Sequence, residues 1–161
     1  MALQHSIRGH PDRPAVTSQK ILVFVLNPGY IRAVKVLVAE DDPDIQVILR
    51  MVLTRLGKCE VVITFRGDEV VPLAKTHQPG LILLDVMLPE MSGFDICKAL
   101  KAEESLKNIP VIFLTARSMP AEMQQALTLG AAGYLAKPFD PMTLVAQINS
   151  IIVPLGSAIG A

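Results

Sequence analysis

The fold of this 161-residue chain is decided by residues 81–93, which read LILLDVMLPEMSG. The four aliphatic residues 81–84 have the length and composition of a strand that is buried on both faces of a parallel sheet. Asp85 follows at the carboxyl end of this strand, where open α/β sheets place their binding sites. The stretch therefore predicts a parallel α/β sheet with a functional carboxylate at its edge.

Three further apolar runs are each followed directly by residues with polar side chains. Residues 36–39 precede Glu40 and Asp41, residues 111–114 precede Thr115, and residues 134–136 precede Lys137. Because the carboxyl ends of parallel strands meet at one edge of a sheet, we expect these residues to converge with Asp85 in one cleft. Three neighbouring carboxylates need a counter-charge, which the lysine and a magnesium ion would supply. The set fits an anion with a transferable phosphoryl group and an aspartate nucleophile.

Short apolar runs alternate with helical patterns from residue 34 onward. We predict strands over 34–39, 59–65, 81–84, 111–114 and 132–135, and helices over 42–56, 67–76, 93–102, 120–130 and 141–153. Pro154 is expected to end the last helix. Strands connected by helices predict a parallel sheet with right-handed crossovers. The predicted fold is a flavodoxin-like, doubly wound (βα)5 sheet with strand order 2-1-3-4-5.

The predicted domain covers residues 34–153 and leaves a segment at each end of the chain. Residues 1–33 are mixed in composition, contain three prolines and have no sustained period. We predict that they form a poorly ordered N-terminal extension. Residues 154–161 are uncharged and are expected to form a short C-terminal tail.

The composition excludes several classes of protein. Fifteen basic and fifteen acidic residues give zero net charge, so we predict no direct DNA binding. No apolar run approaches the roughly 18 residues that cross a bilayer, so no membrane association is expected. The two cysteines, Cys59 and Cys97, fall in predicted regular elements and are expected to be buried thiols rather than a disulfide. These features predict a cytoplasmic protein.

The strings VLVAEDD, LILLDVMLPEMSGFDICKALK, VIFLTA and GAAGYLAKPFD occur in order within residues 34–153. This region resembles a response-regulator receiver domain of two-component signalling. The resemblance implies that Asp85 is the phosphoacceptor. It also implies a Mg²⁺ site formed by Glu40, Asp41, Asp85 and the backbone carbonyl of Met87. Asp41 would ligate the ion directly, and Glu40 would contribute, often through water.

The same resemblance assigns roles at the ends of the fourth and fifth strands. Thr115 would donate a hydrogen bond to the phosphoryl group, and Lys137 would pair with it. The Lys137-Pro138 peptide bond is expected to be cis. Tyr134 occupies an aromatic switch position, and in the family this side chain turns inward when the residue at the place of Thr115 moves toward the phosphoryl group.

Two surfaces are candidates for partner docking. The first helix is predicted to bury Ile45, Leu49, Val52 and Leu56 and to expose Val47 and Met51. In the resembled family the surface around this helix docks the histidine-bearing phosphodonor. The second surface surrounds Gln147 in the last helix. Only Glu122, Lys137 and Asp140 are charged from residue 118 to the end, so we expect either a partner that docks by shape and apolar contact or an ordinary polar surface.

The predicted function is that of a stand-alone receiver, similar to chemotaxis regulators, and not of an enzyme with a free substrate. A sensor histidine kinase or a histidine phosphotransfer protein would phosphorylate it, and a downstream protein target would bind the phosphorylated form. In the resembled family, the positions of Met87 and Arg117 beside the site tune dephosphorylation, and the bulky Met87 therefore predicts a long-lived phosphoform. Two alternatives stay open: a phosphorylation-independent interaction module and a Mg²⁺-dependent aspartyl phosphohydrolase. Such hydrolases usually carry a second aspartate where this chain has Met87.

Overall fold

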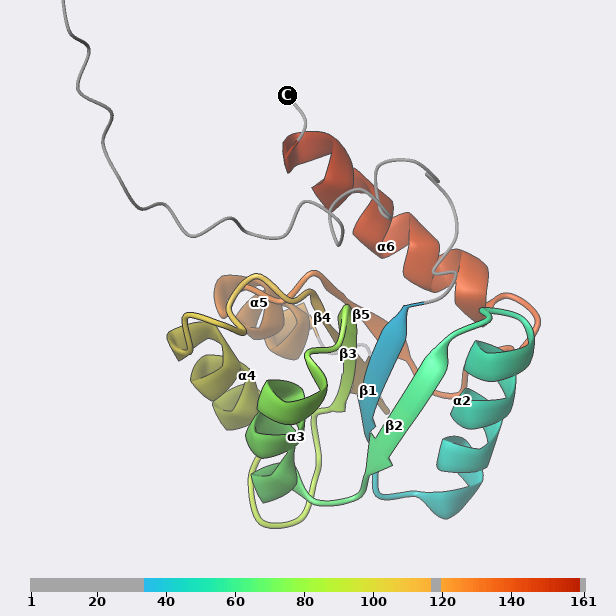
Figure 1. The fold of residues 1–161 in the computed structure, drawn as a ribbon, viewed down its shortest axis with the longest axis horizontal. Coiled ribbons are helices and arrows are strands. Elements are labelled where there is room, and N and C mark those ends of the chain that lie inside the picture. Colours follow the sequence, from blue (N-terminus) through green and yellow to red (C-terminus); the bar gives the residue numbers. More distant parts are fainter. Residues whose placement is uncertain (1–33, 117–119, 160–161) are drawn as a thin grey trace, which may run out of the picture.

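Figure 1 shows a sheet that is covered by helices on both faces. The computed structural model describes residues 34–116 and 120–159, and beyond residue 152 only the course of the backbone is described. The five strands are parallel, in the order β2-β1-β3-β4-β5. They are β1 Lys35–Ala39, β2 Glu60–Thr64, β3 Leu81–Asp85, β4 Val111–Thr115 and β5 Gly133–Ala136. The helices are α2 Pro43–Arg55, α3 Val70–His77, α4 Gly93–Ala102, α5 Pro120–Thr128 and α6 Leu144–Ile159, with a 3₁₀ turn η1 over Gly67–Glu69. The predicted fold class and strand order are confirmed.

Successive residues of the central strands point into two different cores. On β3, Leu81 and Leu83 pack with residues of α2 and α6, whereas Ile82 and Leu84 pack with residues of α3, α4 and α5. This alternation follows from the pleat, which sends neighbouring side chains to opposite faces. All five residues of β3 are buried, because helices cover the sheet on both faces.

Local signals position the ends of α2 and α4 beside the carboxyl edge of the sheet. The Asp42 carboxylate caps α2 by accepting hydrogen bonds from the backbone N–H groups of Asp44 and Ile45, at 2.9 Å and 3.3 Å. Helix α4 begins at Gly93, where an added Cβ would lie only 2.4 Å from the backbone oxygen of Asp85. A glycine is therefore required for α4 to start this close to the end of β3.

The last helix differs from the prediction at both ends. It begins at Leu144, after a turn over residues 141–143, and it continues through Pro154 to Ile159. Proline removes one helical hydrogen bond and crowds the preceding turn, but this local cost does not forbid a helix from continuing. The predicted end of the last helix at Pro154 is therefore wrong. The predicted extension over 1–33 lies outside the described residues.

Two other details of the helices bear on the predictions. Leu56 was assigned to the core but is 51% exposed, because α2 ends at Arg55 and Leu53 is buried instead. Pro72 is the third residue of α3, where its missing N–H has no helical partner to lose.

Among the described residues, no helix is both long enough and apolar enough to cross a membrane. Cys59 and Cys97 are both buried and are not joined in a disulfide, as predicted. Burial raises the pKa of the Cys59 thiol to about 11, so this thiol is protonated at neutral pH.

Candidate functional site

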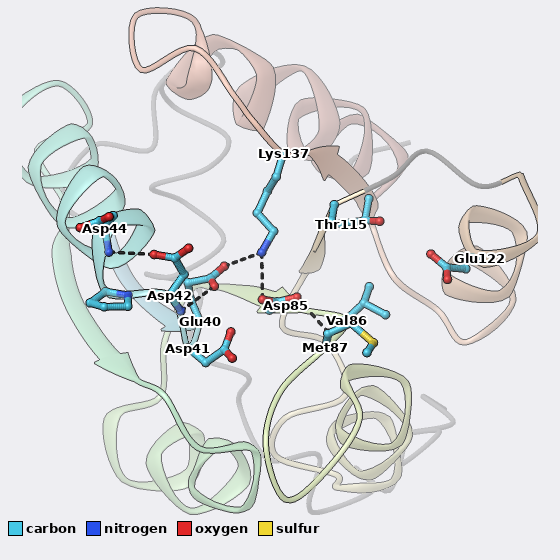
Figure 2. A pocket seen from close by; sticks show the side chains of 12 residues that line it. Glu40, Asp41, Asp42, Asp44, Asp85, Val86, Met87, Thr115, Glu122 and Lys137 are labelled. Atoms are coloured by element: carbon cyan, nitrogen blue, oxygen red, sulfur yellow. Dashed lines mark hydrogen bonds and ion pairs between the residues drawn. The ribbon is translucent and has the colours of Figure 1, made fainter.

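The residues that follow β1, β3, β4 and β5 line one cleft at the carboxyl edge of the sheet (Figure 2). The strand register brings them to one level, because Ala39 pairs with Leu84, Asp85 with Leu114, and Thr115 with Ala136. The cleft is lined by Glu40, Asp41, Asp42, Pro43, Asp44, Asp85, Val86, Met87, Thr115, Ala116, Glu122 and Lys137. The structure thus brings together the acids, the hydroxyl and the lysine that the sequence places at strand ends.

Lys137 joins the two buried carboxylates of the cleft. Its Nζ lies 3.0 Å from Glu40 Oε2 and 2.9 Å from Asp85 Oδ2, and its side chain is only 13% exposed. Burial acts to lower the pKa of Lys137, but the hydrogen bonds to Asp85 and Glu40 and their negative charges outweigh it and raise the pKa. Lys137 therefore stays charged and neutralises part of the acidic cleft.

Glu40 is fully buried, and this burial raises the pKa of its carboxyl to about 7. The negative charge of Asp85 adds to the rise, whereas the Asp42 N–H bond and Lys137 oppose it. A further cation beside Glu40 would favour its ionised form.

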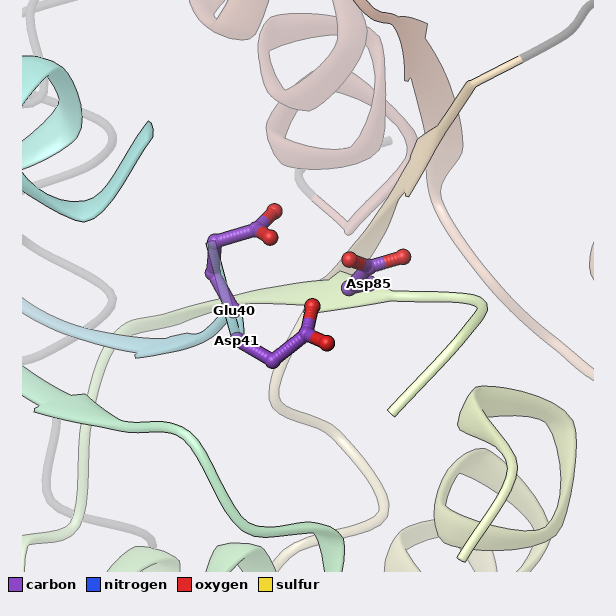
Figure 3. A group of neighbouring side chains, drawn as sticks. All are labelled: Glu40, Asp41 and Asp85. Atoms are coloured by element: carbon purple, nitrogen blue, oxygen red, sulfur yellow. The ribbon is translucent and has the colours of Figure 1, made fainter. Parts of the chain in front are cut away.

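Glu40, Asp41 and Asp85 form the one group of three possible metal ligands found among the described residues, with oxygen atoms within 4.8 Å of one another. Figure 3 shows Glu40 and Asp41 at the end of β1 and Asp85 on β3, with the three side chains gathered in one space. With all three carboxylates ionised, the charge of Lys137 would leave a net charge of −2. This charge and the all-oxygen donor set fit a magnesium ion, which prefers oxygen ligands and keeps some of its waters.

Both oxygens of Asp85 have fixed partners. Oδ2 accepts from Lys137, and Oδ1 accepts from the backbone N–H of Met87 at 2.9 Å. The orientation of the predicted phosphoacceptor is therefore set before any ligand arrives. Thr115 is buried at the end of β4, while the Met87 side chain is 77% exposed at the cleft.

The remaining predicted residues lie away from the carboxylates. Tyr134 is half-buried on β5, against the core beneath α3, α4 and α5. Val47, Met51 and Gln147 are exposed, as predicted, and their docking roles stay predictions. Arg117 lies outside the described residues. The Lys137-Pro138 bond is cis, as the resemblance implies.

Two residues near the cleft were missed from the sequence. Glu122 in the first turn of α5 lines the cleft, with its side chain turned toward it in Figure 2. The amide of Gln46 in α2 donates a hydrogen bond to the backbone carbonyl of Glu40. No run or motif marks either position, because both reach the site only through the packing of their helices.

Comparison with known families agrees with this geometry. Residues 36–149 match the family model described as "Response regulator receiver domain". The match covers more than half of the chain, and the chain therefore belongs to the family of response-regulator receiver domains of two-component signal transduction.

The curated relatives described here are named as transcriptional regulators. The chain is 36% identical over 118 residues to the alkaline phosphatase synthesis transcriptional regulatory protein PhoP of Bacillus subtilis, covering 73% of this chain and 48% of that protein. It is 38% identical to the probable transcriptional regulator ycf27 of Cyanophora paradoxa, with the same coverages. The chain thus spans about half the length of these curated relatives.

This chain matches two solved structures over nearly the whole length of each solved chain. The chemotaxis response regulator CheY4 of Vibrio cholerae is 31% identical, with a TM-score of 0.70, over 74% of this chain and 98% of that one. The receiver domain of the sensor histidine kinase PA1611 from Pseudomonas aeruginosa PAO1 is 29% identical, with a TM-score of 0.67, over 76% and 98%. That structure has a magnesium ion coordinated in its active-site cleft.

Proposed function

We propose that this chain accepts a phosphoryl group on Asp85 in a magnesium-dependent reaction and signals by phosphorylation-dependent protein binding. The donor is a sensor histidine kinase or a histidine phosphotransfer protein. One observation carries the proposal: the Asp85 carboxylate lies at the end of β3, 2.9 Å from Lys137 Nζ and grouped with Glu40 and Asp41. This arrangement pairs a fixed oxygen nucleophile with the charges that a phosphoryl anion requires.

Each residue of the site has a role in the transfer. An oxygen of Asp85 forms the new bond to phosphorus while the bond from phosphorus to the donor's histidine nitrogen breaks, and the electron pair stays on that nitrogen. Lys137 pairs with the transferred group, and the Thr115 hydroxyl donates a hydrogen bond to it. Asp41, Asp85, the Met87 carbonyl and, in part through water, Glu40 would hold the magnesium ion. When bound there, the ion would supply positive charge that stabilises the phosphoryl oxygens.

Phosphorylation adds a charge of about −1.5 to −2 to the cleft. Movement of Thr115 toward this charge vacates space at the end of β4, and Tyr134 turns inward to fill it. The two packings form a pair of states whose populations phosphorylation shifts. The partner-binding surface around α5, β5 and α6 reads out this shift.

The test is intact-mass measurement after incubation with acetyl phosphate, with and without Mg²⁺, on the wild type and two variants. We expect one added phosphoryl group in the wild type, only with magnesium, and none in Asp85→Asn. Asp95→Asn changes an exposed aspartate of α4 in the same way and should be phosphorylated normally. An unmodified wild type would reject the proposal and favour a receiver-like module that binds its partners constitutively.

Several finer points remain proposals. Val47 and Met51 dock the phosphodonor, so Met51→Glu should slow transfer from the cognate kinase, and an unchanged rate would reject this role. Exposed Met87 hinders the attacking water, so Met87→Asn should shorten the phosphoform half-life.

Three properties of the whole protein stay predictions. They are action without an attached output domain, absence of direct DNA binding and a cytoplasmic location. Relatives such as the "DNA-binding response regulator MtrA" of Mycolicibacterium smegmatis match over only 49% of their length.

A further inference from the structure

The side chain of Gln46 closes the turn between β1 and α2. Gln46 lies inside α2, where its backbone N–H donates to the Asp42 carbonyl at 3.0 Å. Its side-chain Nε2 reaches back over the first turn and donates to the backbone carbonyl of Glu40 at 2.5 Å. A carbonyl oxygen only accepts, so the amide nitrogen has to face it. Gln46 therefore ties the helix to the residue that follows the last position of β1.

This bond completes the anchoring of Glu40. The backbone N–H of Glu40 donates to the Thr64 carbonyl of β2 at 3.1 Å. Its Oε1 accepts from the Asp42 N–H, and its Oε2 accepts from Lys137 Nζ, both at 3.0 Å. The hydrogen bond from the Gln46 amide to the Glu40 carbonyl is the fourth. Glu40 therefore has four hydrogen-bond partners, which are Thr64, Asp42, Lys137 and Gln46.

Asp41 stands between two anchored residues. Glu40 precedes it and Asp42 follows it. The Asp42 side chain caps α2, and the Asp42 backbone N–H donates a hydrogen bond to the Glu40 carboxylate. The Asp41 side chain itself is exposed and lies within reach of Asp85. The backbone that carries Asp41 is thus fixed from both sides, while its carboxylate remains available to a ligand.

We propose that Gln46 is a positioning residue for the metal site: its amide holds the β1–α2 turn so that Glu40 and Asp41 keep their spacing to Asp85 before the cation binds. The inference rests on the proposed function, because it takes the three acids as the magnesium site. Groups that hydrogen-bond to metal-ligating residues commonly change metal affinity about 10–100-fold when removed. Loss of the Gln46 amide should therefore weaken magnesium binding without removing any ligand.

The test compares Gln46→Met with the wild type. Methionine keeps the length of the side chain and removes the donor, and Gln124→Met makes the same change at an exposed position of α5. Calorimetric titration with Mg²⁺ alone should give a Kd raised about tenfold in Gln46→Met and unchanged in Gln124→Met. Phosphorylation by acetyl phosphate should need correspondingly more Mg²⁺ for half-saturation and return to the wild-type rate at saturating Mg²⁺.

Thermal unfolding in EDTA separates positioning from a merely structural role. A Gln46→Met protein that loses stability but binds Mg²⁺ with the wild-type Kd would overturn the inference, as would a wild-type Kd at wild-type stability. A wild type that binds no Mg²⁺ would overturn the proposed function and the inference with it. The wild-type titration thus distinguishes failure of the proposed function from failure of the role of Gln46 alone.

Discussion

The cleft at the carboxyl edge concentrates charge, whereas the β5 edge of the molecule, defined here as α5, β5 and α6, is almost free of it. Six carboxylates and one lysine line the cleft. From residue 118 onward the chain has only three charged residues, and two of them, Glu122 and Lys137, line the cleft. The added charge of a phosphoryl group on Asp85 would therefore act inside the cleft, and a signal at the β5 edge would have to travel through packing.

The largest expected effect in the cleft comes from removing its lysine. Lys137→Met leaves the buried carboxylates of Glu40 and Asp85 without their shared counter-charge, which should cost about 3–5 kcal/mol of unfolding free energy. Phosphorylation of Asp85 should also be lost. Urea unfolding at pH 8 in EDTA measures the first effect, and intact mass measures the second.

An exposed ion pair provides the control for this change. Lys75 and Glu103 connect α3 and α4 at 2.8 Å, with side chains 49% and 40% exposed. Lys75→Met should cost no more than about 1 kcal/mol, because solvent screens the pair. Equal losses of unfolding free energy in Lys137→Met and Lys75→Met would contradict the view that an ion pair contributes more to stability in the cleft than at the surface.

The next largest effect is a pH dependence that Glu40 imposes on the metal-free protein. Burial raises the pKa of this carboxyl from its ordinary 4.5 to about 7, so the folded state holds a proton that the unfolded state releases. Stability is therefore lost as pH rises through this window, by about 3 kcal/mol at 1.36 kcal/mol per pKa unit.

Glu40→Gln removes the titration and should remove this pH dependence. The difference in unfolding free energy between Glu40→Gln and the wild type should shift in favour of the variant as pH rises from 4.5 to 7. Urea unfolding in EDTA across this range measures it. Glu60→Gln, at the exposed start of β2, is the control and should follow the wild type. Parallel curves for all three proteins would show that Glu40 does not titrate in this window.

The sheet and the polar set at its edge were predictable because each depends on a local pattern. An aliphatic run predicts a doubly covered strand wherever it occurs, and the residue after the run must lie at the carboxyl edge. Asp85, Thr115 and Lys137 follow from that rule alone. The shared edge of parallel strands then brings them together without further information.

The errors arise where a local rule meets tertiary structure. Leu56 lies at the helical spacing expected of a core residue. Helix α2 ends at Arg55, however, one residue before Leu56, and Leu53 is buried instead. Pro154 predicts a helix end, yet α6 continues past it. Glu122 reaches the cleft through the placement of α5, and the Gln46 amide reaches the Glu40 carbonyl from α2; no pattern within those helices encodes either contact.

Two glycines provide a smaller test of the same contrast between the regions. A Cβ at Gly93, beside the cleft, would meet backbone atoms of Asp85 and Val86 at 2.4 Å and 2.9 Å. A Cβ at Gly133, in β5, would instead meet side-chain atoms of Ile151, the nearest at 2.8 Å. Backbone at the end of a buried strand yields less than an isoleucine side chain, which can shift by rotation.

We therefore expect Gly93→Ala to lower the unfolding free energy by about 1–3 kcal/mol, and Gly133→Ala to lower it by less. Gly93→Ala should also slow phosphorylation, because it displaces the backbone of Asp85 itself. Urea unfolding and acetyl-phosphate labelling measure the two effects. A greater loss in Gly133→Ala would show that the β5 edge is the more tightly packed region.

The smallest expected effect on the folded protein lies on the β5 edge, at Gln147. This side chain is exposed on α6, and its amide donates a hydrogen bond to the Thr143 hydroxyl at 3.2 Å. Gln147→Lys should change the unfolding free energy by less than about 0.5 kcal/mol and leave phosphorylation unchanged. It should nevertheless weaken binding of the downstream partner, because a charge that enters an apolar interface has to lose its water.

Affinity capture with the phosphorylated chain as bait measures this effect, with Thr76→Lys on α3 as the matched exposed control. A partner that the wild type and Thr76→Lys retain, but Gln147→Lys loses, would place the readout on the uncharged edge. Equal recovery with all three baits would make the surface around Gln147 an ordinary polar surface. In that case the contrast in charge between the cleft and the β5 edge would carry no information about where the partner binds.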